Sequence, residues 1–193
     1  VYTYNAINGE LRHEDANISH PIRSITAIND STLWIGADGE GLYQFNRFAP
    51  TQKASKKPTS AISAPANGIY DIQNDLDFIW ISTYDSGILV FNKDKIVSNR
   101  FVHLKDDRNS LINNHVNAII EDQDERLWFG TNAGLSIYNP KQNHWDNYDE
   151  NNSVLLALHR DQNNDIWVGG YARSVYLYSN KTRLFQKLDI NHS

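Results

Sequence analysis

The sequence predicts an all-β protein: a β-propeller with four blades, each a four-stranded antiparallel meander. Three observations carry the prediction. A strand centred on tryptophan occurs four times in the 193 residues, the segments on either side recur in the same order, and the tryptophans lie 46, 48 and 39 residues apart. A propeller blade takes roughly 40–45 residues. The four tryptophans are Trp34, Trp80, Trp128 and Trp167.

The first two strands of each predicted blade are apolar and joined by a polar turn. The tryptophan strands are apolar at nearly every residue, which indicates burial on both faces, because successive side chains of a strand point to opposite sides. Propeller blades meet this condition, since each sheet lies between two neighbours. We therefore expect the four tryptophans in the core between blades. The first strands are expected at residues 24–28, 69–72, 116–120 and 154–158.

The third and fourth strands complete each meander. Gly41, Gly87 and Gly134 precede three of the third strands and supply the positive φ that a tight hairpin needs, whereas Ser174 stands there in the last copy. The fourth strands are more polar, as suits an outer edge. The third strands are expected at 42–46, 88–92, 135–139 and 175–179, and the fourth at 100–104, 144–148 (which contains Trp145) and 184–188.

The predicted blades divide the whole chain. We expect residues 1–5 to form the last strand of a preceding blade, and residues 47–66 to form an extended loop where the first blade has no clear fourth strand. A closed four-bladed ring would then hold two strands for one place, so the pattern favours an arc of a larger ring. Its terminal faces would be apolar, and we expect self-association. The blades are expected at about 20–66, 67–106, 113–150 and 153–190.

Composition and motifs exclude several classes of function. The net charge is −5 and the small basic cluster lies in the long loop, so no nucleic-acid partner is expected. The chain lacks cysteine, and it starts at Val1 without any methionine, which favours a piece of a longer protein. Asp161, Asn163 and Asp165 resemble the opening of a calcium loop, but Ile166 replaces its glycine. No metal, cofactor or catalytic residue is predicted.

The candidate binding residues come from the expected geometry. In a meander blade, the loops between strands two and three share one rim with the connectors between blades, and loops carry function disproportionately. The alternative is that these are ordinary turn residues. The candidates are Asp38, Tyr84, Asp85, Asn132, Tyr171 and Arg173 in the loops, and His115 in a connector.

The repeat resembles a known family. Leu127-Trp128-Phe129-Gly130-Thr131 followed by Gly134-Leu135, and the connector from Phe101 to Asp122, are similar to the two-component regulator propeller repeat. Four copies in phase make the resemblance specific. Ser82 in place of the motif glycine, Ser174 and the long loop depart from the pattern and affect only local turn geometry.

The resemblance implies a function. Members of this family form the periplasmic sensor region of hybrid two-component histidine kinases of Bacteroidetes, with seven-bladed propellers, and many respond to oligosaccharides. It implies that the partners are the remaining blades and domains of the parent sensor, and an oligosaccharide ligand. Two alternatives stay open: a protein-interaction scaffold, although the Trp-Asp signature of such propellers is absent, and a propeller lyase or hydrolase, which would need converging acids, bases or metal ligands.

Overall fold

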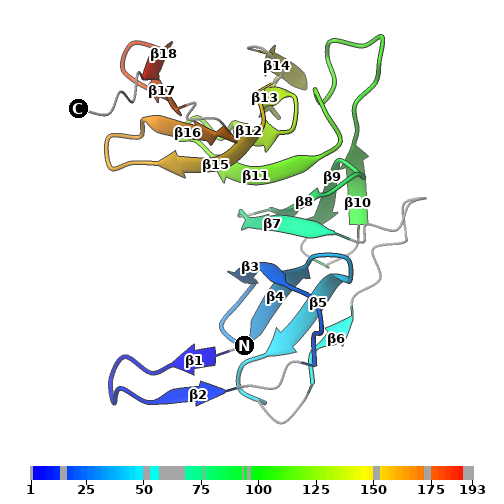
Figure 1. Ribbon diagram of the computed structural model, residues 1–193, viewed down its shortest axis with the longest axis vertical. Helices are drawn as coiled ribbons and strands as arrows, with labels where there is room; N and C mark the ends of the chain where they lie inside the picture. Colours follow the sequence, from blue (N-terminus) through cyan, green and yellow to red (C-terminus); the bar gives the residue numbers. More distant parts are fainter. Residues whose placement is uncertain are drawn as a thin grey trace.

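Four four-stranded antiparallel sheets follow one another in an open arc (Figure 1). The computed structural model describes residues 2–13, 17–49, 53–56, 68–75, 77–92, 94, 97–149, 153–171 and 175–188. Neighbouring strands in each sheet are consecutive in sequence, so every sheet is a meander. The first strand lies at the inner side of the arc and the fourth at the outer side (Figure 1). The predicted all-β fold of four-stranded meanders is confirmed.

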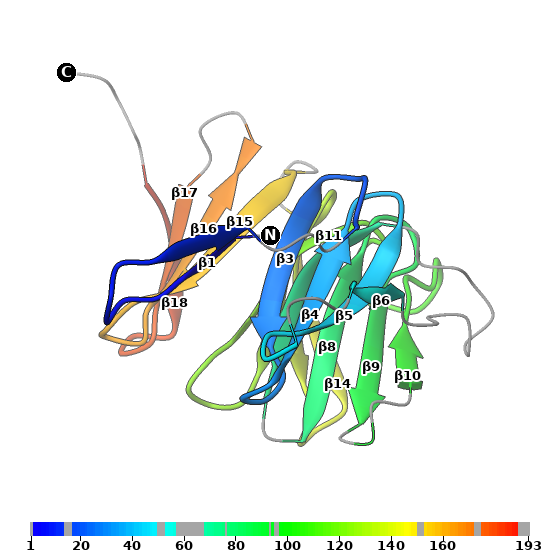
Figure 2. The same cartoon turned by 90° about the horizontal axis from the view of Figure 1, so that it is seen from below.

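Each sheet is one blade, named by its order in the chain. Blade 1 consists of β3 (Ile22–Ala27), β4 (Thr32–Ala37), β5 (Gly41–Asn46) and β6 (Ser55–Lys56); blade 2 of β7 (Ile69–Asn74), β8 (Phe78–Thr83), β9 (Ile88–Asn92) and β10 (Val97–Phe101). Blade 3 consists of β11 (Val116–Glu121), β12 (Leu127–Thr131), β13 (Gly134–Asn139) and β14 (His144–Tyr148); blade 4 of β15 (Leu155–Arg160), β16 (Ile166–Gly170), β17 (Val175–Ser179) and β18 (Leu184–Leu188). The strands of the blades run in roughly similar directions, so their turns gather at two opposite ends (Figure 2).

Three elements differ from the sequence prediction. The fourth strand of blade 2, expected at 100–104, is β10 at Val97–Phe101, because its pairing with β9 runs from Val97 to Phe101. The segment expected as a lone strand at residues 1–5 forms a hairpin, in which β1 (Tyr2–Tyr4) pairs with β2 (Leu11–His13). Its sequence matches the third and fourth strands of the other blades, because Tyr4 and Asn5 stand where Tyr138 and Asn139 end β13. The blade 1 loop contains a short fourth strand, since β6 pairs with Tyr43 and Gln44 of β5. Two polar residues carry no strand pattern, so sequence could not reveal β6.

The core lies between the blades. Trp34 and Trp128 are fully buried and Trp80 is 5% exposed, each packed against the first strand of the next blade or its neighbours. Trp167 is 37% exposed, unlike the expectation for all four tryptophans, because blade 4 ends the arc and has no following blade in this chain. Trp145 is buried beside Phe129 and Tyr138.

The polar turn before each tryptophan strand has a structural role. The carboxylates of Asp75, Asp122 and Asp161 accept the indole N–H of Trp80, Trp128 and Trp167 at 2.6, 2.8 and 2.9 Å. A buried indole N–H without a partner would be costly. The same carboxylates accept backbone N–H groups of their own turns, so one side chain closes the turn and fixes the tryptophan.

Candidate functional site

Each first strand carries a β-bulge at its second residue. The strand register shifts between Ile22 and Ser24 in blade 1, and at the matching point in the other three blades. A bulge leaves one residue unpaired and redirects its side chain. The four bulge residues are Arg23, Tyr70, Asn117 and Leu156.

A repeated backbone hydrogen bond holds the loop that follows each tryptophan strand. The first loop residue donates its N–H to the carbonyl of the connector that enters the same blade, at 2.8–3.1 Å in all four blades. The four donors are all predicted binding residues, and they therefore occupy equivalent backbone positions. The donor and acceptor pairs are Asp38 and Pro21, Tyr84 and Gly68, Asn132 and His115, and Tyr171 and Val154. We call these loop, connector and bulge positions the rim.

An ion pair and two tyrosines join blades 1 and 2 on the rim. Arg23 Nη2 donates to Asp38 Oδ2 at 2.7 Å, and this hydrogen bond raises the pKa of Arg23. The guanidinium carbon also lies 5.0 Å from the centre of the Tyr70 ring, within the range of a cation–π contact. Tyr70 in turn meets Tyr84 edge to face, with ring centres 6.0 Å apart.

His115 continues this contact chain into blade 3. Its ring centre lies 4.4 Å from that of Tyr84 and 5.3 Å from that of Tyr70. Burial lowers the pKa of His115, and a hydrogen bond with Asn117 and the nearby carboxylates of Asp85 and Asp38 oppose that shift. The imidazole is therefore biased towards its neutral form among aromatic rings.

Amides form the rim in blade 3 and contact the backbone of blade 4. Asn117 Nδ2 donates to Asn132 Oδ1 at 3.0 Å and to the carbonyl of Leu155 at 2.8 Å. The bulge residue and the loop residue thus meet again, as Arg23 meets Asp38. Contacts between adjacent blades make the rim a continuous surface over blades 1 to 3.

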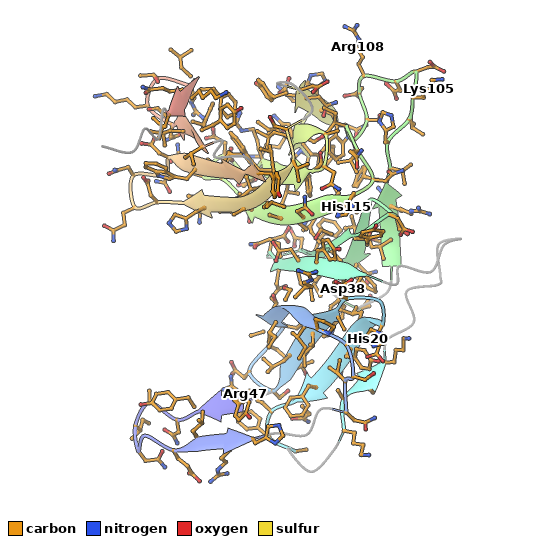
Figure 3. All side chains as sticks on the ribbon, viewed as in Figure 1. His20, Asp38, Arg47, Lys105, Arg108 and His115 are labelled. Carbon is orange, nitrogen blue, oxygen red and sulfur yellow. The ribbon has the colours of Figure 1, made fainter. Side chains whose placement is uncertain are left out.

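The structure brings together five of the seven predicted residues. Asp38, Tyr84, Asp85, His115 and Asn132 are linked through the contacts above. Asp38 and His115 lie on either side of β7 (Figure 3).

The other two predicted residues are not part of this group. Tyr171 occupies the equivalent position in blade 4 and is 73% exposed. Arg173 lies outside the described residues.

Sequence reasoning missed three members of the rim. Arg23, Tyr70 and Asn117 lie within strands, and the prediction considered only loops and connectors. Each directly follows the apolar residue that begins its strand, but β3 and β7 contain further polar residues, so no sequence signal marks the bulge position.

Cavities are present among the described residues, whereas metal-binding groups and membrane-spanning helices are not. Two cavities of about 880 and 280 Å³ lie between adjacent blades, and none of the seven predicted residues lines them. Within the described ranges, no group of three His, Asp or Glu side chains is arranged to hold a metal. The same residues contain no helix of the length and hydropathy that a membrane span requires.

One segment of the chain matches a known family model. Residues 110–133, which include the connector, β11 and the tryptophan strand of blade 3, match the two component regulator propeller family. The chain is 26% identical over 191 residues to histidine kinase P4 of Formosa agariphila, a match that covers 91% of this chain and 14% of that protein.

Solved structures share the fold. The extracellular domain of a B. thetaiotaomicron protein assigned as a hybrid two component system is similar with a TM-score of 0.76 and 24% identity, over 97% of this chain and 24% of that one. A second such domain from the same organism has a TM-score of 0.59 and 17% identity, over 96% and 31%. The chain spans about a seventh of the kinase and less than a third of either domain.

Proposed function

Because the chain carries a two-component regulator propeller repeat, we propose that it is part of the extracytoplasmic, periplasmic sensor of a hybrid two-component histidine kinase. In this proposal, the rim recognises a small polar ligand. The remaining blades and domains of the parent sensor are its partners. The similarity to a histidine kinase and to two extracellular domains supports this role.

One observation supports the rim as the recognition surface: its backbone is repeated while its chemistry changes. The bulge and loop positions hold an ion pair in blade 1, two tyrosines in blade 2 and two amides in blade 3. Packing alone does not require this variety. A rigid scaffold that presents different polar groups at equivalent positions is suited to distinguishing ligands.

The chemistry of the rim favours an oligosaccharide. Tyr84 is 51% exposed and offers an aromatic surface to the apolar faces of a sugar ring. Asp38, Asn117 and Asn132 offer hydrogen-bond donors and acceptors for hydroxyl groups. Several sugar units would be needed to reach from blade 1 to blade 3, so we propose an oligomer rather than a monosaccharide.

A ligand on the rim would act by joining blades. Binding shifts a receptor only if the ligand has different affinities for two states. A ligand that contacts residues of three blades favours the state in which those blades are in register. We propose that this restraint is passed to the rest of the parent sensor.

The direct test is calorimetric titration of the chain with a panel of oligosaccharides, comparing Tyr84→Ala with Tyr4→Ala. Tyr4 is a matched control because it is exposed and lies in the β1–β2 hairpin, which takes no part in the rim contacts described above. We expect Tyr84→Ala to weaken binding about tenfold, equivalent to about 1.4 kcal/mol, and Tyr4→Ala to leave it unchanged. Equal effects, or a bound sugar seen only on the outer strands, would refute the rim as the site.

We also propose that this segment has no catalytic activity of its own. Asp38 is held by Arg23, and His115 packs among tyrosines, which suits recognition more than proton transfer. We expect no cleavage of oligosaccharides by the purified chain. Turnover that disappears in Asp38→Asn or Asp85→Asn would overturn this proposal.

A further inference from the structure

The interface between blades 3 and 4 contains a half-buried arginine. The guanidinium carbon of Arg126 lies 5.6 Å from the ring centre of Trp128 and 5.5 Å from that of Tyr178. Its Nε donates to Asp122 Oδ2 at 2.7 Å, and its Nη2 donates to Tyr178 Oη at 3.3 Å. A second cation, Arg183, pairs with Asp124 beside it. The chain's own arginines therefore fill this interface.

The interface between blades 2 and 3 repeats the same surroundings. Trp80, Tyr138 and Asp75 correspond to Trp128, Tyr178 and Asp122 in the repeat. Asp75 accepts the indole N–H of Trp80 at 2.6 Å, as Asp122 accepts that of Trp128 at 2.8 Å. The ring centres of Trp80 and Tyr138 lie 6.2 Å apart.

The two arginines have no counterparts in this second interface. Phe78 stands at the position of Arg126, and Asn143 at that of Arg183. Asp77, which corresponds to Asp124, has no ion pair with any described residue. In this interface lies the cavity of about 880 Å³, lined by both rings and by Asp75, Asp77 and Phe78. We call it the interblade cleft.

The interblade cleft is acidic as well as aromatic. Four carboxylates line it, whereas its one described cation, Lys141, bonds to Glu125 at 2.9 Å. Burial raises the pKa of Glu121, and the charges of Asp75 and Glu125 raise it further against the opposing effect of Arg160. A cation bound in the cleft would relieve this repulsion. The lining carboxylates are Asp75, Asp77, Glu121 and Glu125.

We propose that the interblade cleft binds an arginine side chain of a peptide or protein partner. The guanidinium lies in the cavity beside the Phe78 ring, which packs edge to face on Trp80 with ring centres 6.2 Å apart. It contacts the aromatic lining and is within reach of the turn carboxylates, as Arg126 is one interface further along. The cleft is much larger than a guanidinium group and is of the size of ligand pockets, so it also holds part of the peptide chain.

This site is independent of the proposed rim function. Phe78 begins β8 and lines the cleft, whereas Tyr84 follows the end of the same strand and lies on the rim. The two sites thus lie at opposite ends of the blade. A ligand on one leaves the other accessible.

The first test is calorimetric titration of the chain with a capped Gly-Arg-Gly tripeptide. The matched probes are the same peptide with citrulline, which is isosteric but neutral, and with lysine. We expect the citrulline peptide to bind at least about tenfold more weakly because it loses the charge-assisted hydrogen bonds. The lysine peptide is also weaker, since an ammonium lacks the planar group that stacks on rings. Equal binding of the citrulline peptide would overturn the proposal.

Two variants locate the site. Phe78→Arg places an arginine of the chain itself in the interblade cleft, as Arg126 is placed in the next interface. We therefore expect binding of the arginine peptide to be lost. Asp77→Asn weakens binding about threefold or more, whereas Asp30→Asn, in the corresponding turn of blade 1, leaves it unchanged. Unchanged binding in both Phe78→Arg and Asp77→Asn would overturn the proposal. Tyr84→Ala, on the rim, should retain peptide binding. The test of the interblade cleft is therefore independent of whether the rim binds an oligosaccharide.

Discussion

At the scale of single residues, the same tryptophan of the repeat has different surroundings in different blades. Trp128 is fully buried against blade 4, whereas Trp167 is 37% exposed. Both indoles donate to a turn aspartate, so the hydrogen bond is common to them and packing differs. Their contributions to stability should therefore differ through burial.

Substitution of the two tryptophans tests this difference. We expect Trp128→Ala to lower the free energy of unfolding by roughly 3–5 kcal/mol, the range for a large buried aromatic residue. Trp167→Ala should cost about half as much, and Asn132→Ala, in a turn, less than either. Denaturant melts measure all three. Equal losses for Trp128→Ala and Asn132→Ala would contradict the assignment of the core.

The pKa of His115 provides a second test at this scale. Burial lowers it from the ordinary value of 6.5, so the folded state disfavours the protonated ring. The folded protein consequently loses stability as the pH falls below 6.5 and through the lowered pKa. We expect an NMR titration to give a pKa below 6.5, and Tyr84→Ala to raise it by admitting water. Tyr171→Ala is the control, and a shift of equal size there would exclude direct contact as the cause.

At the scale of the element, glycine determines how closely two blades approach. A Cβ added to Gly36 would lie 2.6 Å from Ile69 Cγ2 in the next blade, whereas one added to Gly169 would meet nothing nearer than 3.7 Å. Both glycines occupy the same position of the repeat. The close approach therefore explains Gly36, and the absence of a following blade in this chain leaves space at Gly169.

This contrast predicts different changes in stability for the same substitution at the two glycines. Gly36→Ala should destabilise the chain by about 1–3 kcal/mol because it overpacks the interface. Gly169→Ala should change stability by less than about 0.5 kcal/mol or raise it slightly, since alanine restricts the unfolded chain. Thermal melts of both variants provide the measurement. A loss at Gly169→Ala as large as at Gly36→Ala would show that interblade contact is not the cause.

At the scale of the whole molecule, the arc has two open faces. Ile25 of blade 1 is 49% exposed and Trp167 of blade 4 is 37% exposed, although the matching residues Ile72 and Trp128 are buried between blades. Apolar faces of this kind normally meet a partner. In the parent protein the proposed partners are further blades.

We expect the isolated chain to self-associate through these faces. Light scattering at micromolar concentration should give a mass above that of one chain, either from two arcs that close a ring or from open head-to-tail assemblies. Trp167→Lys should shift the distribution towards the monomer. Leu104→Lys is the control, because Leu104 is similarly exposed but lies in a connector. If the unsubstituted chain stays monomeric throughout the concentration range, this expectation is refuted.

The sequence by itself determined the blades, because their pattern is local. A tryptophan strand apolar on both faces and a polar turn before it recur within each repeat, and a glycine follows the strand in three of the four. The positive φ of Gly41, Gly87 and Gly134 confirms the predicted hairpins. The loop residues of the rim could be predicted from the sequence for the same reason, since they follow each tryptophan strand directly.

Only the tertiary structure decided which residues of different repeats meet. The bulges that bring Arg23, Tyr70 and Asn117 to the rim depend on pairing between strands and leave no pattern in sequence. The interblade cleft depends on the packing of one sheet against the next, where Phe78 replaces the arginine of the following blade. The repeat specifies each sheet through contacts within it, whereas the interblade cleft and the contacts that continue the rim from blade to blade arise between sheets.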